Sequence, residues 1–343
     1  MKERFIKIVN LQLFAEVNMN VQTTGTSALS AEMKTFYDMT LIDLAEPELV
    51  HAQFGQKRPI PKNGGKIIEF RQFSSLPKAL TPLTEGVTPN GRNLTVTAKT
   101  ATVSQFGDYI TVSDLLELTS IDPVIVEATK LTGSQAGRTL DTIVRNILVG
   151  GTNVYYQPKS AGTAVTSRAG LDATCTLTPA TVRKVAGLLK RVNAKKIDGK
   201  YVAIIHSDVA TDLQGTTEWQ EAQKYVHPEN IYNGEIGELY GVRFVETSEA
   251  KIWNDKTNDG TPEGLAVYGC LFLGANAYGV TDIEGGGLEH IVKQKGSAGT
   301  ADPLNQRSTI GWKENGYTAC RLVEEYMVRV ECVSSLSASA EAN

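Results

Sequence analysis

The chain has 343 residues, and its 34 basic and 38 acidic side chains give a net charge of −4. With 41% hydrophobic and 21% charged residues, it is a globular chain that can bury a substantial core, which excludes a disordered protein. The acidic balance excludes a generally basic nucleic-acid binder, but it does not exclude a local basic face.

Cysteine spacing and hydropathy exclude further classes of protein. The four cysteines contain no C-x-x-C pair, so neither a zinc ribbon nor a disulfide scaffold is predicted: Cys175, Cys270, Cys320 and Cys332. We expect free thiols made in a reducing cytoplasm. The sequence contains no run of about 18 apolar residues, so no transmembrane helix is predicted. Asn10 and Gln12 interrupt the apolar stretch that a secretory signal needs, so residues 1–29 are expected to form an extended arm.

The next segments predict two helices and a long hairpin. Ser30 can cap a helix that runs to Leu44, and Pro47 can open a second short helix that ends at Gly55. Residues 57–112 then predict two long strands, Lys66–Phe73 and one from Leu94 through Val103 toward Val112, around a loop rich in proline and glycine. An isolated hairpin is marginal in water, so this one lies on a neighbouring subunit or packs on its own domain.

The second half of the chain alternates helices and strands. Asp122 and Pro123 open a helix of about 28 residues, roughly 42 Å long, that stops at Gly150-Gly151. Residues 170–310 predict a separate α/β region in which Asp208 caps a short helix. Its other predicted elements are a helix from Thr178-Pro179 and strands at 201–205, 242–246, 265–273 and 288–293. Residues 317–333 predict one long final strand.

No motif predicts catalysis or metal binding. The histidines lack metal-ligand spacing, and neither a P-loop nor a G-x-S-x-G elbow occurs. His206, Ser207 and Asp208 are adjacent, so their side chains diverge and cannot form a triad. The turn at Asp255–Gly260 imitates an EF-hand but has Ala266 where calcium needs glutamate. Glu324 and Glu325 would point to opposite faces of a strand. We therefore predict no catalytic residue, cofactor or metal, and no enzyme.

One basic cluster allows two interpretations. Seven cations fall within 18 residues and are opposed only by Asp198: Arg183, Lys184, Lys190, Arg191, Lys195, Lys196 and Lys200. They could contact phosphates without base specificity. They could equally form the solvated face of an amphipathic helix, which is the commoner role of such runs.

Several short motifs follow one another in a recognisable order. They are Asn10-Leu-Gln-Leu-Phe-Ala-Glu16, Lys62-Asn-Gly-Gly-Lys-Ile-Ile-Glu-Phe70, Leu80-Thr-Pro-Leu-Thr-Glu-Gly86, His206-Ser-Asp-Val-Ala-Thr-Asp-Leu213, Gly237-Glu-Leu-Tyr-Gly-Val-Arg-Phe-Val-Glu246 and Gly311-Trp-Lys313. In this order the sequence resembles tailed-phage major capsid proteins of the Hong Kong 97-type fold, and most closely the N4-like major capsid family. The resemblance spans most of the chain.

The resemblance implies an α+β fold with a defined segment order. The implied segments are an N-terminal arm (1–56), a β-hairpin extended loop (57–112), a peripheral domain (113–169) with a spine helix (122–150), a mixed α/β axial domain (170–310), and a return to the peripheral domain with a C-terminal tail (311–343). It implies inter-subunit contacts at Leu76, Pro77, Lys78, Leu80, Leu83, Glu85 and Phe14. Covalent crosslinking through Lys78 is not expected.

The resemblance also implies a function and partners. The protein would be a major head protein that assembles as pentamers and hexamers into an icosahedral shell around double-stranded DNA. It would form the virion capsid, be assembled in the bacterial host cytoplasm, and contact no membrane. The chain has no room for a fused scaffold, so a separate scaffolding protein is expected, together with a portal protein and, on some shells, a decoration protein. The basic cluster without Lys200 would be the DNA-facing patch.

Three alternatives share parts of this pattern. An encapsulin-like shell would have the same fold and hold protein cargo. A soluble α/β enzyme would use Asp208 or His206 as a hydrolase. Another virion part, such as a tail protein, would form tubes or rings instead of shells.

Overall fold

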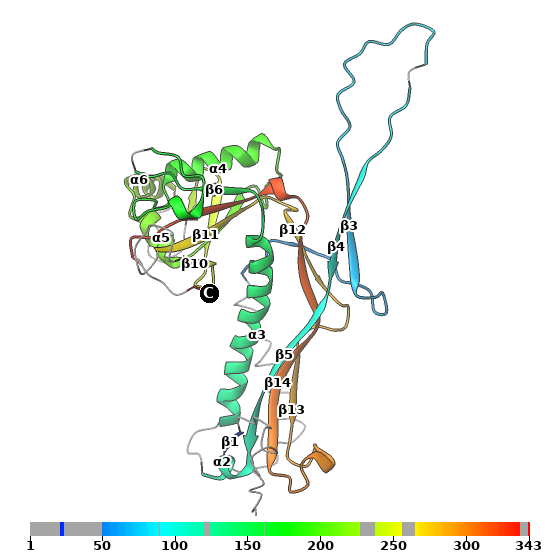
Figure 1. Ribbon diagram of the computed structural model, residues 1–343, viewed down its shortest axis with the longest axis vertical. Coiled ribbons are helices and arrows are strands. Elements are labelled where there is room, and N and C mark those ends of the chain that lie inside the picture. Colours follow the sequence, from blue (N-terminus) through cyan, green and yellow to red (C-terminus); the bar gives the residue numbers. More distant parts are fainter. Residues whose placement is uncertain are drawn as a thin grey trace, which may run out of the picture. The chain divides into compact units, whose positions relative to one another are not determined.

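The computed structural model describes residues 21–23, 50–88, 90–119, 124–160, 162–226, 237–255, 265–336 and 342–343 (Figure 1). These residues form two compact units, and three elements contribute residues to both: β5 (Ser104–Ser113), α3 (Val124–Val149) and β14 (Arg307–Arg321). We describe each unit by itself.

The first unit is small and built on paired strands. β1 (Val21–Thr23) pairs in parallel with β5, and β13 (Glu289–Lys293) pairs antiparallel with the first half of β14. Its described residues also include the first part of α3, the short helix α2 (Asp114–Thr119) and the 3₁₀ helix η4 (Gly299–Ala301). Its buried core contains Val112, Ala128, Val292 and Ile310.

The second unit contains a seven-stranded sheet. The strand order is β6 (Val154–Tyr156), β15 (Met327–Cys332), β11 (Leu265–Leu273), β7 (Tyr201–Ile205), β9 (Val242–Glu246) and β8 (Glu238–Leu239), with β10 (Ile252–Asp255) paired to β11. All nine residues of β11 and all five of β7 are buried. Both faces of these strands are covered, which explains why they occur as continuous apolar runs in the sequence.

Helices cover both faces of this sheet. On one face, α4 (Pro179–Arg191), α5 (Ser207–Gln214) and α6 (Thr217–Val226) enclose a core that includes Ala203 and Ile205 of β7. On the other face, the second half of α3 shares a core with Val202 and Ile204, to which the helix contributes Leu140 and Leu148. Alternate residues of β7 thus point to opposite cores, as the period of a strand requires.

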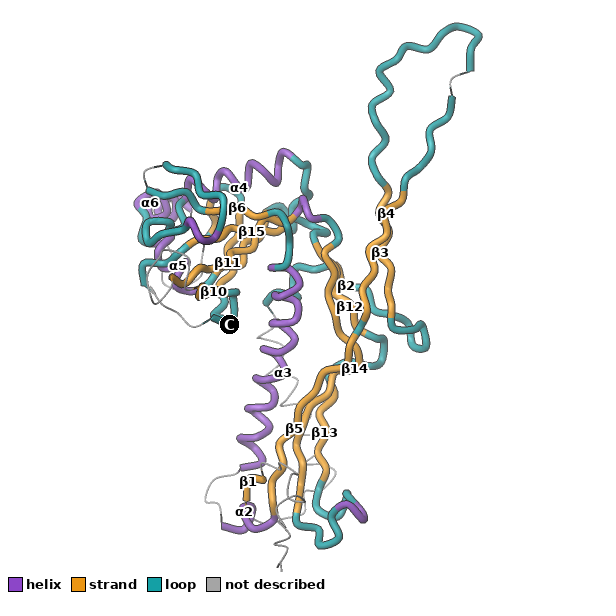
Figure 2. Tube along the Cα trace, viewed as in Figure 1, coloured by secondary structure: helices purple, strands orange, loops and turns teal. Residues whose placement is uncertain are grey.

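A separate two-stranded hairpin also belongs to the second unit. β3 (Ile67–Phe73) pairs antiparallel with β4 (Val96–Thr102), from Ile67 opposite Thr102 to Phe73 opposite Val96. Figure 2 shows that the residues between these strands form a long loop. The predicted hairpin is confirmed, but its second strand does not continue to Val112. The buried Val103 ends β4, and β5 beyond it pairs with β1.

The predicted final strand is wrong as one element. β14 ends at Arg321, a 3₁₀ turn η5 (Glu324–Tyr326) follows, and β15 then enters the seven-stranded sheet. The Tyr326 N–H donates to the Val323 carbonyl at 3.1 Å, and Arg321 pairs with Glu324 at 3.2 Å. These contacts close the turn. Glu324 and Glu325 therefore lie in a 3₁₀ turn and not on opposite faces of a strand.

The α/β region predicted for residues 170–310 is divided between sheets. β12 (Tyr278–Asp282) pairs antiparallel with the second half of β14 and in parallel with β2 (Gln56–Lys57), and β13 also pairs with β14. Conversely, β6 and β15, which lie outside that segment, join the seven-stranded sheet. Which sheet a strand joins depends on hydrogen-bonded partners that are distant in the sequence. The residue pattern within each strand therefore does not predict it.

Several helix boundaries can be compared with prediction. α3 agrees with the predicted long helix, while its expected cap residues Asp122 and Pro123 lie outside the described residues, as do 30–49. Residues 51–54 form turns and not the end of a helix. The predicted Asp208 cap of α5 is wrong. His206 is the N-cap, because its Nδ1 accepts the Asp208 N–H at 3.1 Å, and the Asp208 carboxylate accepts the Tyr268 hydroxyl at 2.6 Å.

A buried pair of hydrogen-bonded side chains connects the segment before the hairpin to α3. His51 and Asp141 are 1% and 0% exposed. One Asp141 carboxylate oxygen accepts the His51 backbone N–H at 2.7 Å, and the other lies 2.6 Å from His51 Nδ1. The Tyr278 hydroxyl also donates to the His51 carbonyl. Asp141 therefore satisfies two donors that water does not reach.

Asp141→Asn is expected to lower the free energy of unfolding by about 1–2 kcal/mol. A hydrogen bond to a charged acceptor contributes about 1.5–3 kcal/mol and a neutral one about 1 kcal/mol, so the amide retains only part of the interaction. Urea denaturation of unassembled subunits measures the change. Asp198→Asn is the matched control, since Asp198 is exposed and its φ of 48° suits asparagine. Equal unfolding midpoints for the two variants would contradict the expectation.

Candidate assembly surfaces

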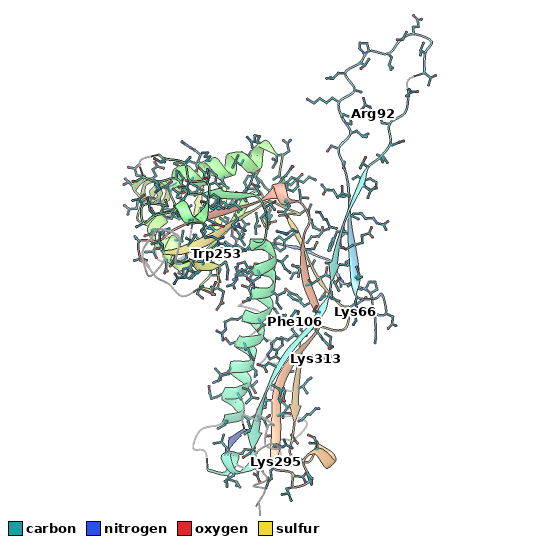
Figure 3. All side chains as sticks on the ribbon, viewed as in Figure 1. Lys66, Arg92, Phe106, Trp253, Lys295 and Lys313 are labelled. Carbon is teal, nitrogen blue, oxygen red and sulfur yellow. The ribbon has the colours of Figure 1, made fainter. Side chains whose placement is uncertain are left out.

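The tip of the hairpin is exposed along its whole described length. Each predicted contact residue in this loop is exposed: Leu76, Pro77, Lys78, Leu80, Leu83 and Glu85. Leu80 is 82% and Leu83 is 77% exposed. Figure 3 shows the side chains projecting from both arms of this loop near Arg92. Phe14, the remaining predicted contact, lies outside the described residues. Large apolar side chains gathered on one exposed loop make the hairpin tip a candidate contact surface.

The strands of the hairpin have almost no core of their own. In the part of the chain that the structure describes, β3 and β4 pair only with each other. Phe70 and Ala101 are their only buried residues. Since a two-stranded hairpin is marginal in water, the hairpin needs a second surface to cover it. Of the two possibilities that the sequence allows, this geometry favours a surface on another subunit.

The predicted basic cluster forms one exposed surface, which we call the α4 face. Its members are all exposed: Arg183, Lys184, Lys190, Arg191, Lys195 and Lys196. α4 contains no acidic residue, and its apolar residues Val182, Val185, Ala186 and Leu189 point into the core. Lys200 is not part of this surface, because it forms an ion pair with Glu238. The helix is amphipathic, as predicted, and its polar side is entirely cationic or neutral.

Aromatic rings support three cations of the α4 face. The Lys184 ammonium lies 5.0 Å from the centre of the Tyr155 ring. The Arg183 guanidinium lies 5.9 Å from the Tyr240 ring, and the Lys196 ammonium lies 5.9 Å from the Tyr201 ring. Such contacts orient a cation without neutralising it, so its N–H donors remain available to an anion.

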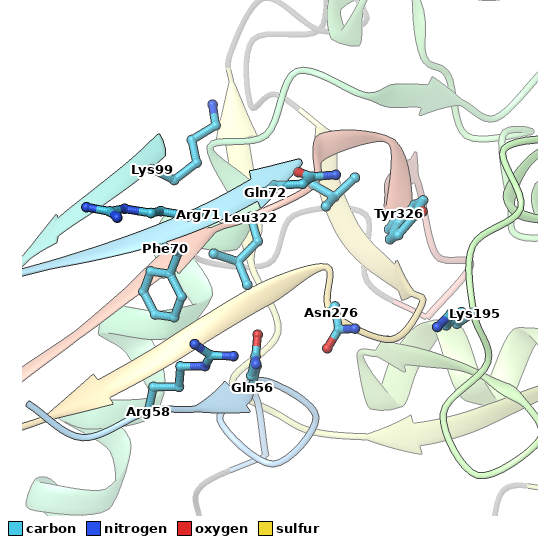
Figure 4. A pocket seen from close by; sticks show the side chains of 11 residues that line it. Gln56, Arg58, Phe70, Arg71, Gln72, Lys99, Lys195, Asn276, Leu322 and Tyr326 are labelled. Carbon is cyan, nitrogen blue, oxygen red and sulfur yellow. The ribbon is translucent and has the colours of Figure 1, made fainter. Parts of the chain in front are cut away.

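A groove beside the base of the hairpin was not predicted from the sequence. It has a volume of about 380 Å³, and four of its lining residues are cations: Arg58, Arg71, Lys99 and Lys195 (Figure 4). Gln56, Gln72 and Asn276 add amide groups, and no described carboxylate lines it. We call this the cationic groove. The four cations come from four separate segments, so no local motif in the sequence could reveal it.

The candidate residues of the enzyme alternative make structural contacts, and the described residues bring together no metal-holding group. Among them, no group of three or more His, Cys, Asp or Glu side chains is placed to hold a metal ion. His206 and Asp208, the residues of the enzyme alternative, serve as a helix cap and a partner of Tyr268. The four cysteines are free, and burial raises the pKa of the Cys175 thiol. None of the described helices has the length and apolar character needed to cross a membrane.

Comparisons with known proteins identify the fold. The capsid protein of Ralstonia phage GP4 superimposes with a TM-score of 0.62 at 13% identity, covering 84% of this chain and 89% of that chain. The cyanophage Pam1 capsid superimposes with a TM-score of 0.61 at 14% identity, covering 93% of this chain and 98% of that chain. The head structure of Helicobacter pylori bacteriophage KHP40 superimposes with a TM-score of 0.58 at 14% identity, covering 97% of this chain and 99% of that chain. These likenesses show a shared mixed α/β capsid fold.

Sequence comparison supplies the family. Curated proteins give no match to the chain. The family model described as phage capsid protein matches residues 112–323, which include most of the second unit and half of the first. The match extends over more than half of the sequence and agrees with the fold. The chain therefore belongs to the phage capsid protein family.

Proposed function

We propose that this protein is the major capsid protein of a tailed bacteriophage of the N4-like type, with a Hong Kong 97-type fold. It assembles as pentamers and hexamers into an icosahedral shell that encloses double-stranded DNA. The observation that carries the proposal is the hairpin, a long two-stranded element with an exposed apolar tip and almost no core of its own. Membership of a capsid family supports a structural role and not a catalytic one.

Each segment has a proposed part in the shell. The hairpin of β3 and β4 with its tip is an extended loop that lies over a neighbouring subunit, while most of the arm expected for 1–56 lies outside the described residues. α3 is the spine helix of a peripheral domain, to which β14 returns the chain before β15 enters the seven-stranded sheet. The seven-stranded sheet and its helices, which include β6 and β15 from outside 170–310, supply the axial domain at the centres of pentamers and hexamers. Many moderate contacts of this kind stabilise a closed shell together.

The proposed partners follow from the same role. Copies of the chain contact one another through the hairpin tip, and a separate scaffolding protein guides their assembly in the bacterial cytoplasm. A portal protein occupies one vertex, packaged DNA contacts the inner surface without sequence preference, and the outer surface accepts a decoration protein in some shells. Covalent crosslinking through Lys78 is not proposed.

Negative-stain electron microscopy tests the proposed function. The full chain is expressed with and without its neighbouring genes, and closed angular shells or free pentamers and hexamers are expected. Shells that contain an enzyme cargo in place of DNA would indicate the encapsulin-like alternative. Tubes or rings would indicate another virion part. A monomer under every condition would overturn the proposal.

A further inference from the structure

The α4 face and the cationic groove share one residue. Lys195 follows α4 in the chain, is exposed, and lines the groove together with Arg71 and Lys99. Both surfaces belong to the second unit. Figure 4 shows Lys195 on one side of the groove and the cations of the hairpin base on the other. The two surfaces thus continue into each other, and we call them together the cationic track.

The track carries almost no opposing charge. α4 has no acidic residue, and no described carboxylate lines the groove. Arg71 does pair with Glu69 at 2.6 Å, but both side chains are largely exposed, so this pair is screened and contributes little. Apart from Glu69 and the exposed Asp198, which follows Lys196 in the chain, the track has an excess of cations that raises the local potential and attracts polyanions.

The donors of the track suit phosphate oxygens. Arginine, lysine and amide side chains are the groups that most often contact a nucleic-acid backbone. α4 alone has 13 residues and a length of about 20 Å, along which a duplex presents a phosphate about every 1.7 Å. The supporting contacts of Lys184 on Tyr155 and Arg183 on Tyr240 hold their cations on the surface.

We propose that the cationic track binds the phosphodiester backbone of the packaged double-stranded DNA without sequence preference. The inference rests on the proposed function and adds to it the surface that faces the shell interior. A carboxylate-rich face of a second copy is the competing partner, and the experiment below separates the two.

Fluorescence anisotropy of a labelled 30-base-pair duplex tests the proposal. Full-length subunits before assembly are titrated at several salt concentrations. The α4 variant is R183Q/K184Q/R191Q, and the groove variant is R58Q/R71Q/K99Q; all six side chains are exposed. The matched control K62Q/K66Q/K293Q removes the same charge from exposed lysines that line neither surface. Electron microscopy then records whether each variant forms shells.

The expected result is a shallower salt dependence for both track variants. The slope of log K against log salt should fall by about 0.9 for each phosphate that a variant no longer neutralises, up to about 2.7 per variant, equally for two duplexes of different sequence. The control should keep the wild-type slope, and all variants should form shells.

Equal slopes for all proteins would overturn the proposal. Failure of the track variants alone to form shells would overturn it in favour of a contact between copies. Absence of shells from the wild type would refute the proposed function, independently of the slopes.

Discussion

Deletion of residues 74–92 is expected to abolish closed shells and to leave a folded subunit. The described part of this segment is exposed and makes no contribution to the buried cores. Phe73 and Val96 are paired at the ends of β3 and β4, so the deletion leaves Asn93-Leu94-Thr95 as a three-residue connection. Hairpin connections of this length are common, and the two strands can stay paired. The effect should therefore be confined to contacts between subunits.

Electron microscopy and circular dichroism together measure this result. The deletion variant should show wild-type secondary structure and no closed particles. L80S/L83S, which keeps the loop length, should reduce the yield of shells, because two leucines that are mostly exposed in the subunit would no longer bury apolar surface on a neighbour. Leu336→Ser is the control, since Leu336 is 60% exposed and lies outside the hairpin. Shells of the deletion variant at wild-type yield would contradict the assigned role of the hairpin.

Elements with a local signal could be predicted from the sequence. α4 begins where Thr178 accepts the Thr181 N–H, directly before a proline in the first turn. β11 is a nine-residue apolar run, and β3 and β4 flank a loop rich in proline and glycine. In each case the residues that determine the element lie within it or beside it. The exposed hairpin tip and the α4 face were predictable for the same reason.

Features that depend on distant partners were not predictable in this way. The end of β14 and β15 look like one strand because residues 317–333 are rich in strand-forming residues, and their separation depends on which neighbours they pair with. At the start of α5, both His206 and Asp208 are residues that can accept a backbone N–H. Asp208 is instead engaged by Tyr268, 60 residues away in the chain. The cationic groove likewise requires four segments to meet.

Glu331 is the clearest case of a residue without a local signal. It lies in β15 among apolar neighbours and is 0% exposed, although a carboxylate is rarely buried alone. Arg168 binds it with two hydrogen bonds of 2.8 Å across a separation of 163 residues. Arg329 Nε lies 2.9 Å from the same carboxylate as an ion pair. The Arg168 guanidinium also stacks 3.8 Å from the centre of the Trp253 ring, which Figure 3 labels.

Glu331→Ala is expected to lower the free energy of unfolding by about 3–5 kcal/mol. The substitution leaves Arg168 and Arg329, whose side chains are 24% and 12% exposed, without their carboxylate partner, and breaking a buried ion pair costs about this much. Urea denaturation followed by tryptophan fluorescence measures the change, because Trp253 lies against Arg168. Glu331→Gln should be destabilised less, since its amide oxygen still accepts one hydrogen bond. The control Glu325→Gln alters an exposed carboxylate and should leave the midpoint unchanged. A decrease below about 1 kcal/mol for Glu331→Ala would place this charge cluster outside the interactions that hold the seven-stranded sheet together.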